Sequence, residues 1–282
     1  MKKGCFLYLV RTSIEDLNGL NKSLELLKTN VFPFCKEVYD ILIFHESSFN
    51  QEYKKAVIKL ENNILFQEIQ FQVPKYSQDI LERIPEYYPH PTHGPGGPYA
   101  HTLPEPHKGF TMGYRHMCNF FSGLIYESNI LKEYKYYLRL DTDSFCLSQI
   151  KYDLFDWMET TNTSFAFIEQ AVQKDNPKVI LGLWNSVKTW IKQNHVSILK
   201  TIEEIPEGTM YYTNFELAET SSFLPGSSYY EFYKFINQSG GIFTNRWGDA
   251  PIKYIGVNLF LEKEKIKPVR GFVYQHGAVY HL

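Results

Sequence analysis

The feature that most constrains the fold is an alternation of short apolar runs with segments of helical periodicity. Cys5–Val10 is an apolar run that ends at Arg11, as expected for a buried strand. Residues 14–29 then place leucines at helical spacing along one face. Strands that alternate with helices in this way indicate an α/β fold with a mixed, mostly parallel central sheet.

The same alternation continues to the end of the chain, without an internal repeat or a clear linker. The further expected strands are Val38–Phe44, Ile64–Val73, Tyr136–Leu140, Phe165–Ile168, Tyr211–Leu217 and Ile266–His276. The further expected helices are Ser48–Leu60, Tyr114–Tyr126, residues 152–159, residues 178–196, Ser228–Asn237 and a helix that starts near Pro251 and ends near Leu261. We therefore predict a single domain over residues 1–282.

Composition excludes several classes of protein. The chain has 29 Lys and Arg against 31 Asp and Glu, a net charge of −2, which argues against binding nucleic acid by broad phosphate neutralisation. The apolar runs are far shorter than the ~18 residues of a membrane-spanning helix. The four cysteines lack a CxxC spacing, so they predict neither a zinc site nor a disulfide framework. With no signal or anchor visible, we expect a cytoplasmic or otherwise soluble protein.

The segment of residues 74–108 interrupts the alternation. It holds eight of the 14 prolines and four histidines, at positions 90, 93, 101 and 107. The histidines could bind a metal, but no acid or cysteine lies at ligand spacing, so a Pro/His-rich long loop within the domain is the simpler interpretation. Such a loop could be a packed surface segment or a lid that orders when an acceptor binds.

The strongest local signal for chemistry is Asp141-Thr142-Asp143, directly after the apolar strand Tyr136–Leu140. Ligands of α/β sheets gather at the carboxyl ends of strands, and two carboxylates there suit a hard divalent cation. The alternative is a pair of aspartates in a turn or helix cap. A hydrolase of phosphate esters built on these two acids is a further, weaker possibility.

Three other segments carry chemically capable residues, each with a structural alternative. Residues 246–251, RWGDAP, could form a positioning loop, or a core Trp followed by an N-cap at Asp249. Asn214-Phe215-Glu216 could present an acid or nucleophile, or a solvent-facing Glu. Residues 114–118, YRHMC, could place Arg115 and His116 against an anionic ligand, or expose them on a helix that buries Met117.

Taken together and in this order, these segments resemble the α-1,2-mannosyltransferases of fungal secretory pathways, glycosyltransferase family 15. YRHMC, the strand sequence YYLR at residues 136–139, NFE at 214–216, GGIF at 240–243 and RWGDAP carry the resemblance, which covers nearly the whole chain. It implies the GT-A fold, a Rossmann-like domain that binds a nucleotide-sugar.

The resemblance also implies an activity. Family members are hexosyltransferases that transfer mannose from GDP-mannose to the 2-hydroxyl of a mannose acceptor, in protein glycosylation, with Mn²⁺ and retention of the anomeric configuration. The implied partners are GDP-mannose and a glycan or glycoconjugate acceptor. Alternatives are the same fold with another nucleotide-sugar donor, or a non-catalytic carbohydrate-binding relative.

Site residues follow from the resemblance position by position. Asp141 and His276 match metal ligands, and Glu216 matches the acid proposed as nucleophile. Asp249 matches an active-site acid that could orient the acceptor hydroxyl or accept its proton. Where the family usually has Glu-Pro, this chain has Asp141-Thr142, so we expect Asp143 to share the metal. Retention could use two inversions with a covalent step on Glu216, or a front-side attack.

Substrate-binding positions are implied as well. Arg11 matches an arginine that contacts the nucleotide, and Arg139 could add a charge-assisted hydrogen bond to phosphate. Tyr114 and Trp247 match or adjoin active-site positions. The segment before Asn214, where the family normally carries Cys, His and Trp, reads MYYT here, so the acceptor is not predicted from the resemblance.

Overall fold

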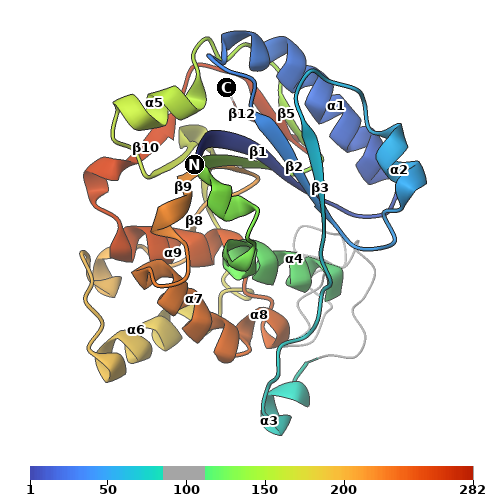
Figure 1. Cartoon of the computed structure of the whole chain (residues 1–282). Coiled ribbons are helices and arrows are strands. Elements are labelled where there is room, and N and C mark those ends of the chain that lie inside the picture. Colours follow the sequence, from blue (N-terminus) through green and yellow to red (C-terminus); the bar gives the residue numbers. More distant parts are fainter. Residues whose placement is uncertain (85–111, 282) are drawn as a thin grey trace.

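The computed structural model describes residues 1–84 and 112–281, and these residues contain a seven-stranded mixed sheet between helices (Figure 1). In spatial order its strands are β10 (Ile266–Val269), β6 (Phe165–Ile168), β9 (Phe215–Glu219), β4 (Tyr134–Leu140), β1 (Lys2–Val10), β2 (Asp40–His45) and β3 (Ile64–Glu68). Neighbouring strands are parallel except at β9, which is antiparallel to both β4 and β6. This arrangement confirms the mixed, mostly parallel sheet.

The helices cover both faces of this sheet. They are α1 (Ile14–Asn30), α2 (Gln51–Ala56), α3 (Gln78–Leu81), α4 (Met112–Ser122), α5 (Leu154–Thr160), α6 (Leu183–Asn194), α7 (Ser228–Gln238), α8 (Gly241–Thr244) and α9 (Asp249–Phe260). Helices α1 and α5 lie on one face, and α4, α7, α8 and α9 lie on the other (Figure 1).

Central strands are apolar on both faces because each face has its own core. In β1, Phe6 and Tyr8 pack with α1, whereas Cys5 and Leu7 pack in the core that contains α4 and α9. All four side chains are buried. A strand covered on both sides reads as a continuous apolar run, which is why its sequence predicts it so clearly.

Two small sheets lie beside the large one and bring distant segments together. One has the order β12 (Val279–His281), β11 (Tyr274–His276) and β5 (Ser144–Cys146), all antiparallel. The other pairs β7 (Val172–Lys174) with β8 (Thr209–Tyr211). Both contribute side chains to the site described below.

Most predicted elements are present, but two predicted strands are divided. The run over Ile266–His276 forms β10 and β11, because Gly271 turns the chain between them with a φ of +86°. The run over Tyr211–Leu217 is divided between β8 and β9. The helix expected over Ser48–Leu60 is shorter, since Asn50 caps α2 with its side chain and the helix ends after Ala56.

The Pro/His-rich segment of residues 74–108 is described only to residue 84. That part contains the short helix α3, while the predicted lid and the four histidines lie outside the described residues. In the described part of the chain, no helix combines the length and the apolar character needed to cross a bilayer.

Candidate active site

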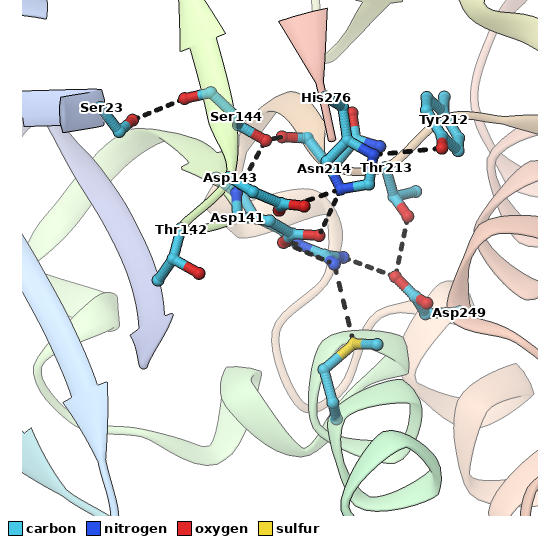
Figure 2. Close-up of polar contacts among 12 residues, drawn as sticks. Ser23, Asp141, Thr142, Asp143, Ser144, Tyr212, Thr213, Asn214, Asp249 and His276 are labelled. Atoms are coloured by element: carbon cyan, nitrogen blue, oxygen red, sulfur yellow. Dashed lines mark hydrogen bonds and ion pairs between the residues drawn. The ribbon is translucent and has the colours of Figure 1, made fainter. Parts of the chain in front are cut away.

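The aspartates that follow β4 lie in a tight turn between β4 and β5. The backbone N–H of Ser144 donates to the carbonyl of Asp141 at 3.0 Å, and the Ser144 hydroxyl accepts from the N–H of Asp141 at 3.2 Å. Thr142, the middle residue, donates its hydroxyl to Asp16 of α1 at 3.3 Å. The turn is therefore held from both sides and presents the carboxylates of Asp141 and Asp143 at the carboxyl end of β4 (Figure 2).

His276 reaches the same place through strand pairing. In the small sheet it lies opposite Ser144, the residue after Asp143, although the two are far apart in sequence. Its Nε2 is 3.2 Å from Asp143 Oδ1 and 3.7 Å from Asp141 Oδ2, and the hydroxyl of Tyr212 lies 3.1 Å from its Nδ1 (Figure 2). Predicted metal ligands that are distant in sequence are thus brought together.

The donor set of this cluster fits a divalent metal ion. One ligand atom from each of Asp141, Asp143 and His276 lies within 4.8 Å of the others. An imidazole beside two carboxylates favours a first-row ion such as Mn²⁺ over Mg²⁺ or Ca²⁺. Burial lowers the pKa of His276, but the two carboxylates outweigh burial and raise it, so the cluster already attracts positive charge.

Arg139 joins this cluster to a second acid. Its side chain is 2% exposed and lies over the ring of Phe121, 3.5 Å from the ring centre. It donates to Asp141 Oδ1 at 3.1 Å and to Asp249 Oδ2 at 2.5 Å. Burial alone would lower the pKa of Arg139, but the surrounding carboxylates raise it, so the guanidinium stays charged.

Asp249 is the first residue of α9 and is not its N-cap, which is Gly248. The capping alternative for Asp249 is therefore wrong. Its carboxylate instead accepts from Arg139 and from the Thr213 hydroxyl, the latter at 2.8 Å. Burial raises the pKa of Asp249, but Arg139 and Thr213 outweigh burial and lower it, so the group is a carboxylate at neutral pH.

These groups line a cavity of about 330 Å³. Its lining also includes Tyr114 and Met117 of α4, and Tyr212 beside His276. The cavity thus adjoins a candidate cation-binding cluster and contains a fixed guanidinium and aromatic side chains. This combination suits an anionic ligand that carries a ring such as a sugar.

Comparison with known proteins places this site in a family. The model of the family described as glycolipid 2-alpha-mannosyltransferase matches residues 1–282. The chain belongs to this family.

Two curated relatives illustrate the match. Glycolipid 2-alpha-mannosyltransferase 1 of Candida albicans is 28% identical over 285 residues, which cover 97% of this chain and 62% of the relative. The probable mannosyltransferase KTR3 of Saccharomyces cerevisiae is 34% identical over 177 residues, 60% of this chain and 43% of the relative. Both relatives are longer than the matched region, so the chain spans only part of their length.

Solved structures show the same fold. The Mn/GDP form of core-mannan synthase A from Aspergillus fumigatus matches with a TM-score of 0.80 and 22% identity, over 99% of this chain and 76% of that one. Ktr4p from S. cerevisiae in complex with GDP matches with a TM-score of 0.78 and 22% identity, over 98% and 71% of the two chains. These matches confirm the predicted fold class.

Besides Asp143, which adjoins the cavity through His276, three predicted site residues of this family member do not line it. Arg11 follows β1, and its largely exposed side chain donates to Asp16 at 2.7 and 3.1 Å. Trp247 is buried, packs against Gly241 and donates its indole N–H to the carbonyl of Leu181 at 3.0 Å. Trp247 therefore lies in the core, next to the loop that carries Asp249.

Glu216 is the third. It lies on β9 directly opposite Arg139 of β4, and only 2% of its side chain is exposed. The expectation of a solvent-facing Glu is therefore wrong. Its Oε1 accepts from the Tyr137 hydroxyl and lies 3.2 Å from Nζ of Lys253. Glu216 does not line the cavity, whereas Arg139, its partner on the neighbouring strand, does.

The YRHMC segment also differs from both of its interpretations. Arg115 is fully buried and donates to the carbonyl of Phe243 at 2.5 Å, so it faces neither the cavity nor solvent. His116 stacks on Phe71, with ring centres 5.3 Å apart. Met117, expected in the core, is half-buried and lines the cavity, where its sulfur lies 3.8 Å from an Arg139 nitrogen.

Sequence reasoning missed several residues of the site. Tyr212 and Thr213 hold His276 and Asp249, and they lie in the segment that was expected to be continuous strand. Asp175, which follows β7, also lines the cavity, and burial raises its pKa. Lys253 was missed although it lies four residues after Asp249, a spacing that places both on one face of a helix.

Proposed function

We propose that this chain transfers mannose from GDP-mannose to a hydroxyl, the 2-hydroxyl of a mannose-containing acceptor, with Mn²⁺ and with retention. The observation that carries the proposal is the meeting of Asp141, Asp143 and His276 beside the Arg139–Asp249 pair at one cavity. Membership in the glycolipid 2-alpha-mannosyltransferase family supports the same activity.

The diphosphate of the donor would lie against the metal cluster. Asp141, Asp143 and His276 would hold Mn²⁺, which supplies positive charge beside the phosphates when GDP leaves. Arg11 lies just beyond β1 at the same edge of the sheet, where it could reach phosphate if it released Asp16. GDP bound to Ktr4p and to core-mannan synthase A supports a guanine nucleotide as the leaving group.

The acceptor would bind on the Asp249 side of the cavity. Asp249 is ionised, fixed by two hydrogen bonds and buried, so it is able to accept a hydrogen bond from the attacking hydroxyl and orient it. Tyr114 and Tyr212 offer aromatic faces for a sugar ring, and Asp175 adds a further acceptor for sugar hydroxyls.

Glu216 would act on C1 of the mannose, the carbon whose bond to GDP is replaced by a bond to the acceptor. In the route with two inversions, its carboxylate bonds to C1 as the C1–O bond to GDP breaks. The acceptor oxygen then displaces the Glu216 carboxylate from C1 and passes its proton to the Asp249 carboxylate. In the front-side route, Glu216 stabilises positive charge at C1 without bonding to it. Both routes need Oε2 of Glu216, which is buried and makes no hydrogen bond with the described residues, to reach C1 past Arg139.

The test is a calorimetric titration of GDP-mannose into the protein with and without Mn²⁺, beside UDP-glucose, UDP-galactose and GDP-fucose. Transfer to a mannose acceptor is followed by product analysis by NMR. Mn²⁺-dependent binding of GDP-mannose and an α-1,2-linked product are expected. An Asp141→Asn variant should lose Mn²⁺-dependent binding, whereas the surface variant Asp156→Asn should bind as the wild type does.

Other outcomes would replace the proposal. Preference for a different donor would keep the fold and overturn the mannose assignment. Binding of glycans that needs neither metal nor nucleotide would identify a carbohydrate-binding protein instead. If no nucleotide-sugar binds or is hydrolysed in the presence of Mn²⁺, the transferase proposal fails.

A further inference from the structure

The ion pair between Lys253 and Glu216 is buried behind the residues that line the cavity. Lys253 of α9 and Glu216 of β9 have exposed fractions of 0% and 2%, and Lys253 Nζ is 3.2 Å from Glu216 Oε1. The pair adjoins the cavity through Arg139, which is the register partner of Glu216 and lines the cavity. Lys253 lies one helical turn after Asp249.

The ammonium of Lys253 is surrounded by partners that compensate for its burial. It donates to the hydroxyl of Tyr126, and the rings of Tyr126, Phe223 and Tyr229 lie 4.6 to 4.8 Å from Nζ. Aromatic faces at this distance attract a cation. Burial lowers the pKa of Lys253, and the neighbouring Glu216 carboxylate opposes this effect.

Stability alone does not explain such a pair. Two buried charges seldom contribute more than well-packed apolar side chains of the same volume, because both must lose their hydration. The cluster is also asymmetric: Lys253, Tyr137 and Tyr126 all contact Oε1 of Glu216, whereas Oε2 has no hydrogen-bond partner among the described residues. One carboxylate oxygen is fixed, and the other is buried without a hydrogen-bond partner.

We propose that Lys253 is a positioning residue that compensates the charge of the Glu216 carboxylate and fixes its Oε1, so that the unpaired Oε2 is the oxygen that meets the reacting sugar. This inference rests on the proposed function, because it gives Glu216 the carboxylate role in mannosyl transfer. Without the ammonium, a carboxylate in this apolar surrounding would favour its protonated form, which neither attacks C1 nor stabilises positive charge there.

The other charged and titratable groups around Glu216 do not replace Lys253. Burial raises the pKa of Tyr126, Tyr137 and Tyr229 well above that of free tyrosine, so all three are neutral. Arg139 is the other nearby cation, and the Glu216 carboxylate contributes to its raised pKa, but its ion pairs are with Asp141 and Asp249 rather than with Glu216. Among the described residues, Lys253 is therefore the cation that contacts Glu216 directly.

The experiment is a double-mutant cycle of wild type, Lys253→Met, Glu216→Gln and the double variant, with kcat and KM for GDP-mannose measured at saturating Mn²⁺. Lys253→Met should lower kcat about 100-fold while KM changes by less than about three-fold. In the Glu216→Gln background, the same substitution should change kcat by less than about two-fold, since the group it acts through is gone.

The pH dependence of kcat gives a second measurement that a merely structural role would not change. Because Lys253→Met removes the positive charge that faces the Glu216 carboxylate, the acidic limb of kcat should lie at higher pH in this variant than in the wild type. Lys253→Arg keeps a cation and should leave the limb in place. The matched control Lys234→Met removes a surface lysine paired with Glu231 and should not change kcat or the limb.

Each outcome separates the inference from the proposed function. If the wild type transfers mannose and Lys253→Met has the wild-type kcat, or if the two substitutions multiply in their effects, the role of Lys253 is overturned while the function stands. If Lys253→Met does not fold, the comparison of kcat between the double variant and Glu216→Gln decides. A kcat that is a further 100-fold lower in the double variant overturns the inference. If the wild type transfers no sugar, the proposed function fails and takes this inference with it.

Discussion

The carboxylates on the two sides of Arg139 are compensated in opposite ways. On the cavity side, Asp141 and Asp143 are 28% and 53% exposed and share a histidine. On the buried side, Glu216 is only 2% exposed and forms an ion pair with Lys253. The exposed acids can take up a cation from solution and release it, whereas Glu216 keeps a permanent one. We therefore expect the exposed acids to serve an exchangeable metal ion and the buried acid to serve as a fixed charge shielded from water.

The two clusters should also differ in how much activity or stability is lost when one of their charges is removed. Near solvent, water screens charges and a lost partner is partly replaced. In the interior, a lost partner leaves an uncompensated charge or an unsatisfied group. Substitutions at Glu216 and Asp249 should therefore have larger effects than substitutions at the turn that holds the exposed acids.

The largest effect is expected from Glu216→Gln. It removes the buried negative charge but keeps the shape, so kcat for mannosyl transfer should fall about 1,000-fold while Mn²⁺ and GDP binding persist. The control is Glu219→Gln on the same strand, whose carboxylate accepts from Ser164 and should not affect kcat. Equal losses for both variants would show that the buried side has no special role.

Asp249→Asn tests the boundary between the two clusters. It breaks the buried pair with Arg139, so kcat should fall about 100-fold and stability by about 3 kcal/mol, measured by transfer assays and urea unfolding. Thr213→Val removes only one hydrogen bond to the same oxygen and should cost about 1 kcal/mol. A loss of stability without a loss of kcat would assign Asp249 a structural role only.

The lowered pKa of Asp249 predicts how the stability difference depends on pH. Because the folded pKa lies below the unfolded value, the stabilising contribution of Asp249 is present above about pH 4 and is lost as pH falls through the folded pKa. The difference between wild type and Asp249→Asn should therefore shrink in acid. A difference that stays constant down to pH 2 would contradict this reasoning.

His276→Ala should weaken Mn²⁺ binding about 10-fold or more, measured by calorimetry, because it removes one of the three proposed ligands on the exposed side. Tyr212→Phe removes only the hydroxyl beside His276 Nδ1, so its effect should be smaller. GDP binding in the absence of metal should not change in either variant. Unchanged Mn²⁺ affinity in His276→Ala would remove His276 from the metal site.

Gly19→Ala should have the smallest effect, on the support of the exposed acids. A Cβ at Gly19 of α1 would lie 2.8 Å from the carbonyl oxygen of Thr142, so the turn between Asp141 and Asp143 must shift. Stability should fall by about 1 to 2 kcal/mol and Mn²⁺ affinity should weaken. Asn18→Ala, exposed on the same helix, is the control. Wild-type Mn²⁺ affinity in Gly19→Ala would show that α1 does not set the position of the turn.

Local patterns predicted much of the fold because the central strands are apolar throughout and the helices have one apolar face. The run Cys5–Val10 needed no knowledge of its neighbours to be recognised. The approach of His276 to Asp143 depends on the β5–β11 register, which no local pattern encodes, so it came only from family resemblance. The contact of Lys253 with Glu216 likewise crosses from a helix to the sheet, and neither residue's neighbours in sequence indicate it.

The reversed direction of β9 has a consequence for attempts to change the acceptor. Because β9 runs antiparallel to β4, the turn that enters it delivers Tyr212 and Thr213 to the cavity and Glu216 to the buried side within five consecutive positions. Inserting or deleting one residue between Thr213 and Glu216 would exchange the two faces of the strand. Libraries that aim at new acceptors should therefore vary side chains at positions 210–213 and keep the length of this segment constant.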